Sequence, residues 1–387
     1  MDKIGDSRNF GFAGLDGQSD AFAITYKIKG ENKTVRHFID IKDFDHGEIE
    51  EILDLASKIV DDPGAYSEAM KHKKIATLFF EPSTRTRLSF EAAMLDLGGS
   101  VIGFSDSSSS SATKGESVRD TVQTVSCYCD VIVMRHPKEG APLLASTVSE
   151  VPIINAGDGG HAHPTQTLTD LFTIKQEMGW FEGLTIGLCG DLLNGRTVHS
   201  LTRAFTRYSN NTFYLISTPE LRLPAHIREF FAGTGNKIVE CSTMEECIGA
   251  LDILYMTRIQ RERFATPGDY ERQAGIYILD EKKLEKARGD LIVLHPLPKI
   301  DEITPSVDDD ARAKYFSQAE YGMYARMALL IRMCAGPGGN AALTPPPLSG
   351  ARCGNHMCIT NSEKYLPALM KSASGHAECA YCGTPNL

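Results

Sequence analysis

A strand, a short turn and a helix follow one another within residues 75–97, and this stretch constrains the fold most strongly. The apolar run 75–80 is typical of a buried strand, and the mostly apolar segment 88–97 predicts a helix that stops at Gly98 and Gly99. The turn between them reads Ser-Thr-Arg-Thr-Arg over residues 83–87. Because first-turn amides lack intrahelical acceptors and carry partial positive charge, this turn suits a phosphate dianion. A simple Ser/Thr cap with solvated arginines is the alternative interpretation.

The same alternation of strand and helix continues along the chain. A chain of 387 residues is too long for a single core, and the alternation predicts two doubly wound parallel sheets with right-handed crossovers and a cleft between them. Further strands are predicted at 101–104, 130–134, 151–155, 184–191, 213–216, 237–240, 252–256 and 291–294, and helices at 43–59, 117–126, 165–175 and 318–333.

The domain boundaries follow from these elements and from composition. Residues 1–36 form an N-terminal extension without an assigned function, although 21–28 could be a strand. The first domain is predicted to span 37–164 and to be completed by the closing helix 318–333. The second spans 165–317, a Gly- and Pro-rich linker spans 334–350, and a small C-terminal domain spans 351–387.

Polar residues follow three strands of the first domain. Arg135 ends one strand, and His163 and Gln166 follow the next. Because open α/β sheets gather ligand groups at the carboxyl ends of their strands, we expect these residues to lie near the 83–87 turn. The serine-rich loop 105–115 reads as a flexible linker, or as a mobile flap whose Lys114 reaches a bound anion.

Two arginines occupy the corresponding strand ends of the second half. Arg196 follows the strand at 184–191, and Arg258 and Gln260 follow the strand at 252–256. Forked guanidinium donors match carboxylates bidentately, although each arginine alone would more often be a surface residue. The glycines after residue 186 do not fit the dinucleotide motif G-x-G-x-x-G, which disfavours a dinucleotide site.

Together these motifs, spread over residues 40–332, resemble the carbamoyltransferases, and aspartate carbamoyltransferases in particular. The resemblance implies transfer of the carbamoyl group of carbamoyl phosphate to the amine of L-aspartate, which yields N-carbamoyl-L-aspartate and phosphate in de novo pyrimidine biosynthesis. It implies a homotrimer with shared active sites and no cofactor for catalysis.

The resemblance also implies roles for individual residues. Those that contact carbamoyl phosphate would be Ser83, Thr84, Arg85, Thr86, Arg135, His163 and Gln166, joined by Ser110 and Lys114 from the neighbouring subunit. The catalytic set among them would be Arg85, Thr86, Lys114, Arg135 and His163, and Gln166 would read the carbamoyl amide. Aspartate would contact Arg196, Arg258, Gln260 and the turn at Pro296 and Leu297.

The alternative enzyme is an ornithine carbamoyltransferase. That enzyme needs an acidic second site and typically has His-Cys-Leu-Pro where residues 295–298 read His-Pro-Leu-Pro. The proline and the Arg258/Gln260 pair therefore favour aspartate. Lys299 and Tyr321 depart from the usual residues of the aspartate family, but neither is a predicted ligand.

Two cysteine pairs lie near the C-terminus. Cys353 and Cys358 are separated by four residues, and Cys379 and Cys382 by two, a spacing that predicts a structural Zn²⁺ site. Two disulfides are the alternative, which a reducing compartment disfavours. The tail resembles the zinc domain of the regulatory chain of aspartate carbamoyltransferase, without that chain's nucleotide-binding domain. The resemblance implies that the tail serves assembly by bridging trimers.

The remaining features limit other functions. A net charge of −10 disfavours a nucleic-acid partner, so a zinc-bearing binding or scaffold protein remains only as an alternative of another class. No apolar run approaches a membrane span and no signal-peptide pattern is present, so we expect a cytoplasmic protein without a membrane partner. The six other cysteines are expected to be small core residues.

Overall fold

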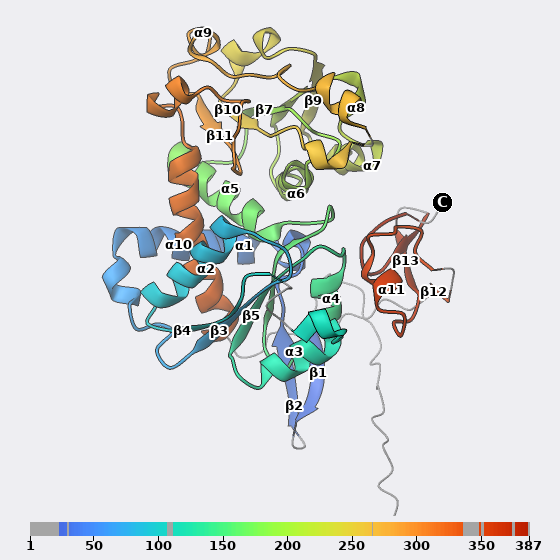
Figure 1. Cartoon of the computed structure of the whole chain (residues 1–387). Helices are drawn as coiled ribbons and strands as arrows, with labels where there is room; N and C mark the ends of the chain where they lie inside the picture. The colour runs from blue at the N-terminus through green and yellow to red at the C-terminus, as the bar shows by residue number, and fades with distance from the viewer. Residues whose placement is uncertain are drawn as a thin grey trace, which may run out of the picture.

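The computed structural model describes residues 23–28, 31–106, 111–264, 266–335, 348–349, 352–373 and 376–385. Two α/β domains lie one above the other, and a small C-terminal unit packs beside the lower, N-terminal domain (Figure 1). Ser110, residues 1–22 of the extension and residues 336–347 of the predicted linker lie outside the described residues.

The first domain is built on a four-stranded parallel sheet with the order β4-β3-β5-β6. Its strands are β3 Lys74–Phe79, β4 Ser100–Phe104, β5 Val131–His136 and β6 Ile153–Asp158. Because successive side chains of a strand point to opposite faces, Ile75 and Phe79 pack into one core and Ala76 and Leu78 into another. Both faces of this sheet are therefore covered by other elements, as a doubly wound sheet requires.

The helices divide between those two faces. The helices of this domain are α1 His46–Asp61, α2 Thr84–Asp96, α3 Val118–Ser126 and α4 Ala141–Ser146. Residues of α1 and α2 share the core of Ile75 and Phe79, whereas α3 and α4 share that of Ala76 and Leu78.

The second domain contains a five-stranded parallel sheet with the order β11-β10-β7-β8-β9. Its strands are β7 Thr185–Cys189, β8 Thr212–Ile216, β9 Lys237–Cys241, β10 Ile253–Met256 and β11 Ile292–Leu294. Its helices are α6 Arg196–Phe205, α7 Ala225–Arg228, α8 Pro267–Glu271 and α9 Glu281–Leu284. The prediction of two doubly wound parallel sheets is confirmed.

Two long helices join the domains. Helix α5 Pro164–Met178 leads from β6 into the second domain, with proline in its first turn and Gly179 at φ +85° beyond its end. Helix α10 Tyr315–Ala335 returns and packs against α1, α2 and α5 (Figure 1). Both helices extend a few residues beyond the predicted 165–175 and 318–333.

The smaller elements lie outside the two sheets. An antiparallel hairpin joins β1 Ala23–Ile28 to β2 Glu31–Arg36. The C-terminal unit contains helix α11 Ile359–Ser362 and the antiparallel strands β12 Leu348–Ser349, β13 Leu369–Ala373 and β14 His376–Cys379. Among the described residues, no helix combines the length and hydropathy that a membrane span requires.

One expectation about the cysteines is wrong. Cys189, Cys241 and Cys247 are buried, but Cys127 is exposed and Cys129 and Cys334 are only partly buried. Cys127 caps the C-terminal end of α3, where the chain turns on the surface, so its place in a helical pattern did not bury it.

Candidate active site

A cavity of about 650 Å³ opens where the two domains meet. Both domains contribute to its wall. The predicted residues that line it are Ser83, Thr84, Arg85, Thr86, Arg135, His163, Gln166, Arg196, Arg258, Gln260, Pro296 and Leu297. The turn predicted to bind phosphate therefore shares one space with the arginines predicted to bind carboxylates.

The phosphate turn lies at the N-terminus of α2. Ser83 is the cap residue, yet its side chain accepts no cap hydrogen bond within the described part of the chain. The simple cap interpretation is therefore not realised, and the first-turn residues Thr84, Arg85 and Thr86 line the cavity. Thr86 is buried, while Arg85 is exposed to the open side. Partial burial and then the charge of Arg135 lower the pKa of Arg85.

Arg135 projects from the carboxyl end of β5 and is held on two sides. Its Nη2 lies 2.8 Å from Glu81 Oε1, and its Nη1 donates to the carbonyl of Ala156 at 3.4 Å. Burial lowers the pKa of Arg135, and Glu81 partly reverses this shift. Sequence reasoning missed Glu81, although it lies two residues before Ser83.

His163 is the N-terminal cap of α5, and this fixes its tautomer. Its Nδ1 accepts from the backbone N–H of Gln166 at 3.3 Å, so in the neutral ring Nε2 carries the proton. Burial, followed by the charges of Arg196, Arg135 and Arg326, holds the pKa of His163 well below its usual range. His163 is consequently neutral at pH 7. Its Nε2 lies 3.4 Å from Arg135 Nη1, so two donors converge on one point of the cavity.

The second domain supplies cations to the opposite wall. Arg196 is the first residue of α6 and donates from Nη1 to the carbonyl of Gly159. Burial, and next the charge of Arg135, lowers the pKa of Arg196 to about 10. Gln260 is fixed by a 3.2 Å bond from its Nε2 to the Asn194 carbonyl, and Arg258 lies beside it after β10. Among the described residues that line the cavity, five are arginines and none is acidic.

The turn after β11 is held by His295. Its Nδ1 accepts from the N–H of Leu297 at 2.7 Å, and its Nε2 donates to Glu302 at 2.8 Å. The Pro296–Leu297 backbone is thereby fixed at the cavity wall. Lys299, one of the two departures from the family, turns away to an ion pair with Asp308 at 3.0 Å.

Sequence reasoning missed Arg326 of α10, which also lines the cavity. Its Nη1 donates to Ser89 Oγ at 3.1 Å, its guanidinium lies over the Phe90 ring, and its Nε has no partner among the described residues. Burial lowers its pKa to about 10. The available signal was an arginine within an apolar helical stretch, a feature that Arg332 of the same helix shares.

Lys114 does not reach this cavity. It ends the short helix Ser111–Lys114 and is exposed on the surface of the chain. The structure therefore brings twelve of the predicted ligands together and leaves Lys114 apart.

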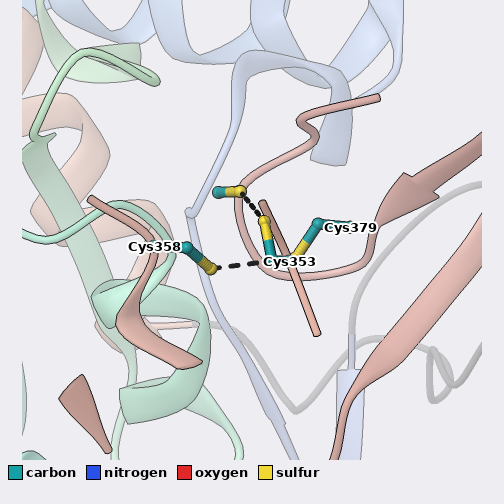
Figure 2. Close-up of side chains that lie close together, drawn as sticks. Cys353, Cys358 and Cys379 are labelled. Carbon is teal, nitrogen blue, oxygen red and sulfur yellow. Dashed lines mark hydrogen bonds between the residues drawn. The ribbon is translucent and has the colours of Figure 1, made fainter. Parts of the chain in front are cut away.

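The four tail cysteines form a separate cluster. All are buried, and their sulfur atoms lie within 4.8 Å of one another (Figure 2). The Cys353–Cys382 and Cys358–Cys379 sulfurs are 3.6 and 3.8 Å apart, far beyond the ~2.05 Å of a disulfide bond. Four ligands at ~2.3 Å from a tetrahedral ion would be ~3.8 Å apart, so the geometry fits Zn²⁺. The Thr360 hydroxyl donates to Cys358 Sγ at 3.2 Å, as an outer ligand partner would.

The C-terminal unit packs on its own chain's first domain. Glu139 forms a two-bond bridge with it: its N–H donates to the Met357 carbonyl at 3.0 Å, and its carbonyl accepts from Ile359 at 2.9 Å. The Glu139 carboxylate accepts from Asn355 Nδ2 at 2.6 Å and from the N–H of Gly160 at 3.1 Å. Glu139 thus links the cysteine unit to the loop that carries His163.

Two family models match the chain. One describes the carbamoyl-P binding domain of aspartate/ornithine carbamoyltransferase and matches residues 36–176. The other describes the Asp/Orn binding domain of the same proteins and matches residues 182–333.

Curated relatives and solved structures agree with these matches. The aspartate carbamoyltransferase catalytic subunit of Lachnoclostridium phytofermentans is 58% identical over 298 residues, which is 77% of this chain and 97% of the relative. The catalytic subunit of M. jannaschii aspartate transcarbamoylase is 48% identical, with a TM-score of 0.72 over 77% of this chain and 97% of the other. A Trypanosoma cruzi aspartate transcarbamoylase in complex with carbamoyl phosphate and aspartate is 38% identical, with a TM-score of 0.72 over 76% and 95%.

Proposed function

The chain belongs to the aspartate/ornithine carbamoyltransferase family, among the aspartate carbamoyltransferase catalytic subunits, and we propose that its cavity transfers the carbamoyl group of carbamoyl phosphate to L-aspartate. The products are N-carbamoyl-L-aspartate and phosphate, a step of de novo pyrimidine biosynthesis. The observation that carries the proposal is the single cavity that joins the Ser83–Thr86 turn to Arg196 and Arg258.

The phosphate of carbamoyl phosphate binds at the N-terminus of α2. The first-turn amides, the hydroxyls of Ser83, Thr84 and Thr86, and the guanidinium of Arg85 supply donors to it. Every donor in this set belongs to one short segment at the N-terminus of α2.

The carbonyl oxygen of the carbamoyl group lies between Arg135 and His163. As the neutral amine forms its bond to the carbonyl carbon, negative charge grows on that oxygen. The C–O bond to phosphate then breaks, and the departing phosphate takes up the proton that the amine loses. Two preorganised donors, Arg135 Nη1 and His163 Nε2, stabilise this charge, and Thr86 adds a third. Because the amine itself is the nucleophile, catalysis rests on positioning and electrostatics.

The amino acid substrate is selected by charge. Arg196 and Arg258 pair with the two carboxylates of aspartate, while Gln260 and the Pro296–Leu297 backbone complete the contact. Ornithine carries a second amine, which would be repelled by the arginine-lined and acid-free wall of the described cavity. This feature favours aspartate over ornithine.

The domain division proposed for this enzyme follows the sequence boundaries. Residues 37–164, completed by the helix at 318–333, bind carbamoyl phosphate, and residues 165–317 bind aspartate. Residues 334–350 are the linker and 351–387 the zinc domain. The two family matches, 36–176 and 182–333, instead meet near the C-terminal end of α5, and the second of them includes the helix at 318–333.

The active form is a homotrimer in which Lys114 and Ser110 complete the site of a neighbouring subunit. The exposure of Lys114, away from the cavity of its own chain, supports this proposal. Such an arrangement makes activity dependent on assembly.

The tail binds one structural Zn²⁺ through Cys353, Cys358, Cys379 and Cys382 and serves the assembly of trimers. The ion would supply much of the folding free energy of a unit too small for a core of its own. Chelation should reduce the oligomer mass on a sizing column to that of a trimer that keeps some activity. Unchanged mass after proven loss of metal would contradict the assembly role.

The experiment that tests the enzyme is a product assay with carbamoyl phosphate and either L-aspartate or L-ornithine. We expect phosphate release and a carbamoylated product with aspartate. An equal or higher rate with ornithine, or no product with either, would refute the proposed function.

A further inference from the structure

A buried carboxylate lies behind the cavity and touches both halves of the site. Asp170 is in α5, one helical turn after Gln166, and is fully buried. The described structure gives it three hydrogen-bond donors. Its Oδ1 accepts from Gln166 Nε2 at 2.8 Å and from Gln318 Nε2 at 2.6 Å, and its Oδ2 accepts from the Tyr255 hydroxyl at 2.9 Å.

These contacts decide which way the Gln166 amide points. An ionised carboxylate only accepts hydrogen bonds, so a reversed Gln166 would place its carbonyl oxygen against Asp170 Oδ1. Such a contact between two acceptors inside the protein would cost the hydrogen bond and add repulsion. Gln166 is therefore held with its NH₂ toward Asp170 and its carbonyl oxygen toward the cavity that it lines.

The Gln318 amide is fixed in orientation as well. Its own Oε1 accepts from the backbone N–H of His295 at 2.9 Å, so its NH₂ also has to face Asp170. Burial raises the pKa of Asp170 to about 6, against the effect of the hydrogen bonds from Gln166, Tyr255 and Gln318. The three donors around Asp170 match an ionised carboxylate, which can only accept hydrogen bonds.

We propose that Asp170 is the positioning residue that makes the site select a carbamoyl group over an acetyl group, because it turns the Gln166 carbonyl oxygen toward the reacting group. The inference rests on the proposed function and adds a residue to it. A carbamoyl NH₂ donates to that oxygen, whereas the methyl of an acetyl group leaves it buried and unpaired. Sites built to bond a substrate donor reject the analogue that lacks it.

The test compares the binding of three ligands in the absence of aspartate: carbamoyl phosphate, acetyl phosphate and inorganic phosphate. Inorganic phosphate reports on the α2 turn alone. In the wild type we expect carbamoyl phosphate to bind at least ~10-fold more tightly than acetyl phosphate. In Asp170→Ala the Gln166 amide can rotate. The ratio of the affinity for carbamoyl phosphate to that for acetyl phosphate should therefore fall by about tenfold, while the affinity for inorganic phosphate stays within ~3-fold of the wild-type value.

Two matched variants separate the orientation of the Gln166 amide from general damage to the fold. Asp170→Asn can keep its oxygen at the Oδ1 position and turn its NH₂ to the Tyr255 hydroxyl, so it should retain the wild-type ratio. Tyr255→Phe removes the bond to Oδ2 and spares Oδ1, and it should also retain the ratio. Should Asp170→Ala fail to fold, Asp170→Ser, whose shorter side chain cannot reach both glutamines, is expected to show the same fall.

The outcomes are distinguishable. If Asp170→Ala or Asp170→Ser keeps the wild-type ratio with normal phosphate binding, the inference is overturned. The inference is also overturned if Asp170→Asn lowers the ratio as much as Asp170→Ala does, or if the wild type binds carbamoyl phosphate and acetyl phosphate equally tightly. A wild type that binds inorganic phosphate but neither acyl phosphate would instead refute the proposed function itself.

Discussion

Arg135 Nη1 and His163 Nε2 lie 3.4 Å apart at the junction of the two domains. Both residues line the cavity and both are held in place: Arg135 by Glu81 and the Ala156 carbonyl, and His163 by the N–H of Gln166. The pair forms a preorganised site for a developing oxyanion.

Removing one donor of this pair should slow the chemistry without loosening the fold. In His163→Asn the Oδ1 can replace Nδ1 as the cap acceptor of α5, but the Nε2–H donor is lost. We expect kcat to fall by about 10²–10³, with an unchanged melting temperature. Steady-state kinetics and calorimetry measure both.

The lowered pKa of His163 predicts how kcat depends on pH. Because His163 stays neutral well below pH 6.5, its protonation should not reduce kcat between pH 8 and 6. A kcat that falls through a pKa near 6.5 in the wild type and not in His163→Asn would contradict the lowered pKa of His163.

Arginines from the two walls should have separable effects. Arg85→Ala removes a phosphate donor, so we expect turnover to be nearly abolished. Arg258→Ala removes a carboxylate partner, so we expect mainly a higher KM for aspartate, by about tenfold or more. Arg272, which is exposed in the second domain and paired with Asp269, provides the control Arg272→Ala. Normal aspartate dependence in Arg258→Ala would show that the assignment of the second site is wrong.

His37 should make the protein sensitive to acid. Burial lowers the pKa of His37 from 6.5 to about 3, so below pH 6.5 the unfolded chain binds a proton that the folded chain excludes. Stability linked to His37 is therefore present above pH 6.5 and is lost as pH falls toward 3. Between pH 7 and 5 the loss is about 2 kcal/mol.

The variant His37→Asn isolates this contribution. Its Oδ1 can replace Nδ1 as the acceptor for the N–H of Ile153, and it does not titrate. Urea unfolding at pH 7 and pH 5 should show the wild type losing about 2 kcal/mol more than the variant. The exposed His72→Asn serves as control. An equal loss in wild type and His37→Asn would contradict the account.

Removal of the proposed Zn²⁺ should weaken carbamoyl phosphate binding through Glu139. The Glu139 carboxylate joins Asn355 of the cysteine unit to the N–H of Gly160, three residues before His163. We expect chelation to raise the KM for carbamoyl phosphate several-fold, and Glu139→Ala to raise it similarly and to make it insensitive to chelation. An equal response to chelator in both proteins would exclude this route.

The sequence predicted the sheets well because buried parallel strands are short apolar runs. It placed the strand at 151–155, whereas β6 is Ile153–Asp158, since Asp158 is buried through side-chain bonds, one of them from Asn155 Nδ2, that hydropathy does not reveal. The exposure of Cys127 was missed for a related reason, because a helical pattern does not tell which end of a helix meets solvent.

The predicted ligands were found as motifs at strand ends, but the residues that orient them were not. Glu81, Asp170, Gln318 and Arg326 act through contacts between segments that are far apart in the chain or, for Glu81, across to a neighbouring strand. The Gln166–Asp170 pair has the local spacing of one helical turn, but no local pattern brings Gln318 to Asp170, because Gln318 lies 148 residues away.

The central claim is that one cavity holds carbamoyl phosphate and aspartate together. N-(phosphonacetyl)-L-aspartic acid, the ligand of a T. cruzi aspartate transcarbamoylase that is 38% identical to this chain, carries a phosphonate and two carboxylates in one molecule. Titration calorimetry with the wild type, Arg85→Ala and Arg258→Ala tests the claim most directly. We expect tight binding to the wild type and at least ~100-fold weaker binding to each variant, since each loses a charged contact to the same ligand. Binding that either variant leaves unchanged would contradict a shared site.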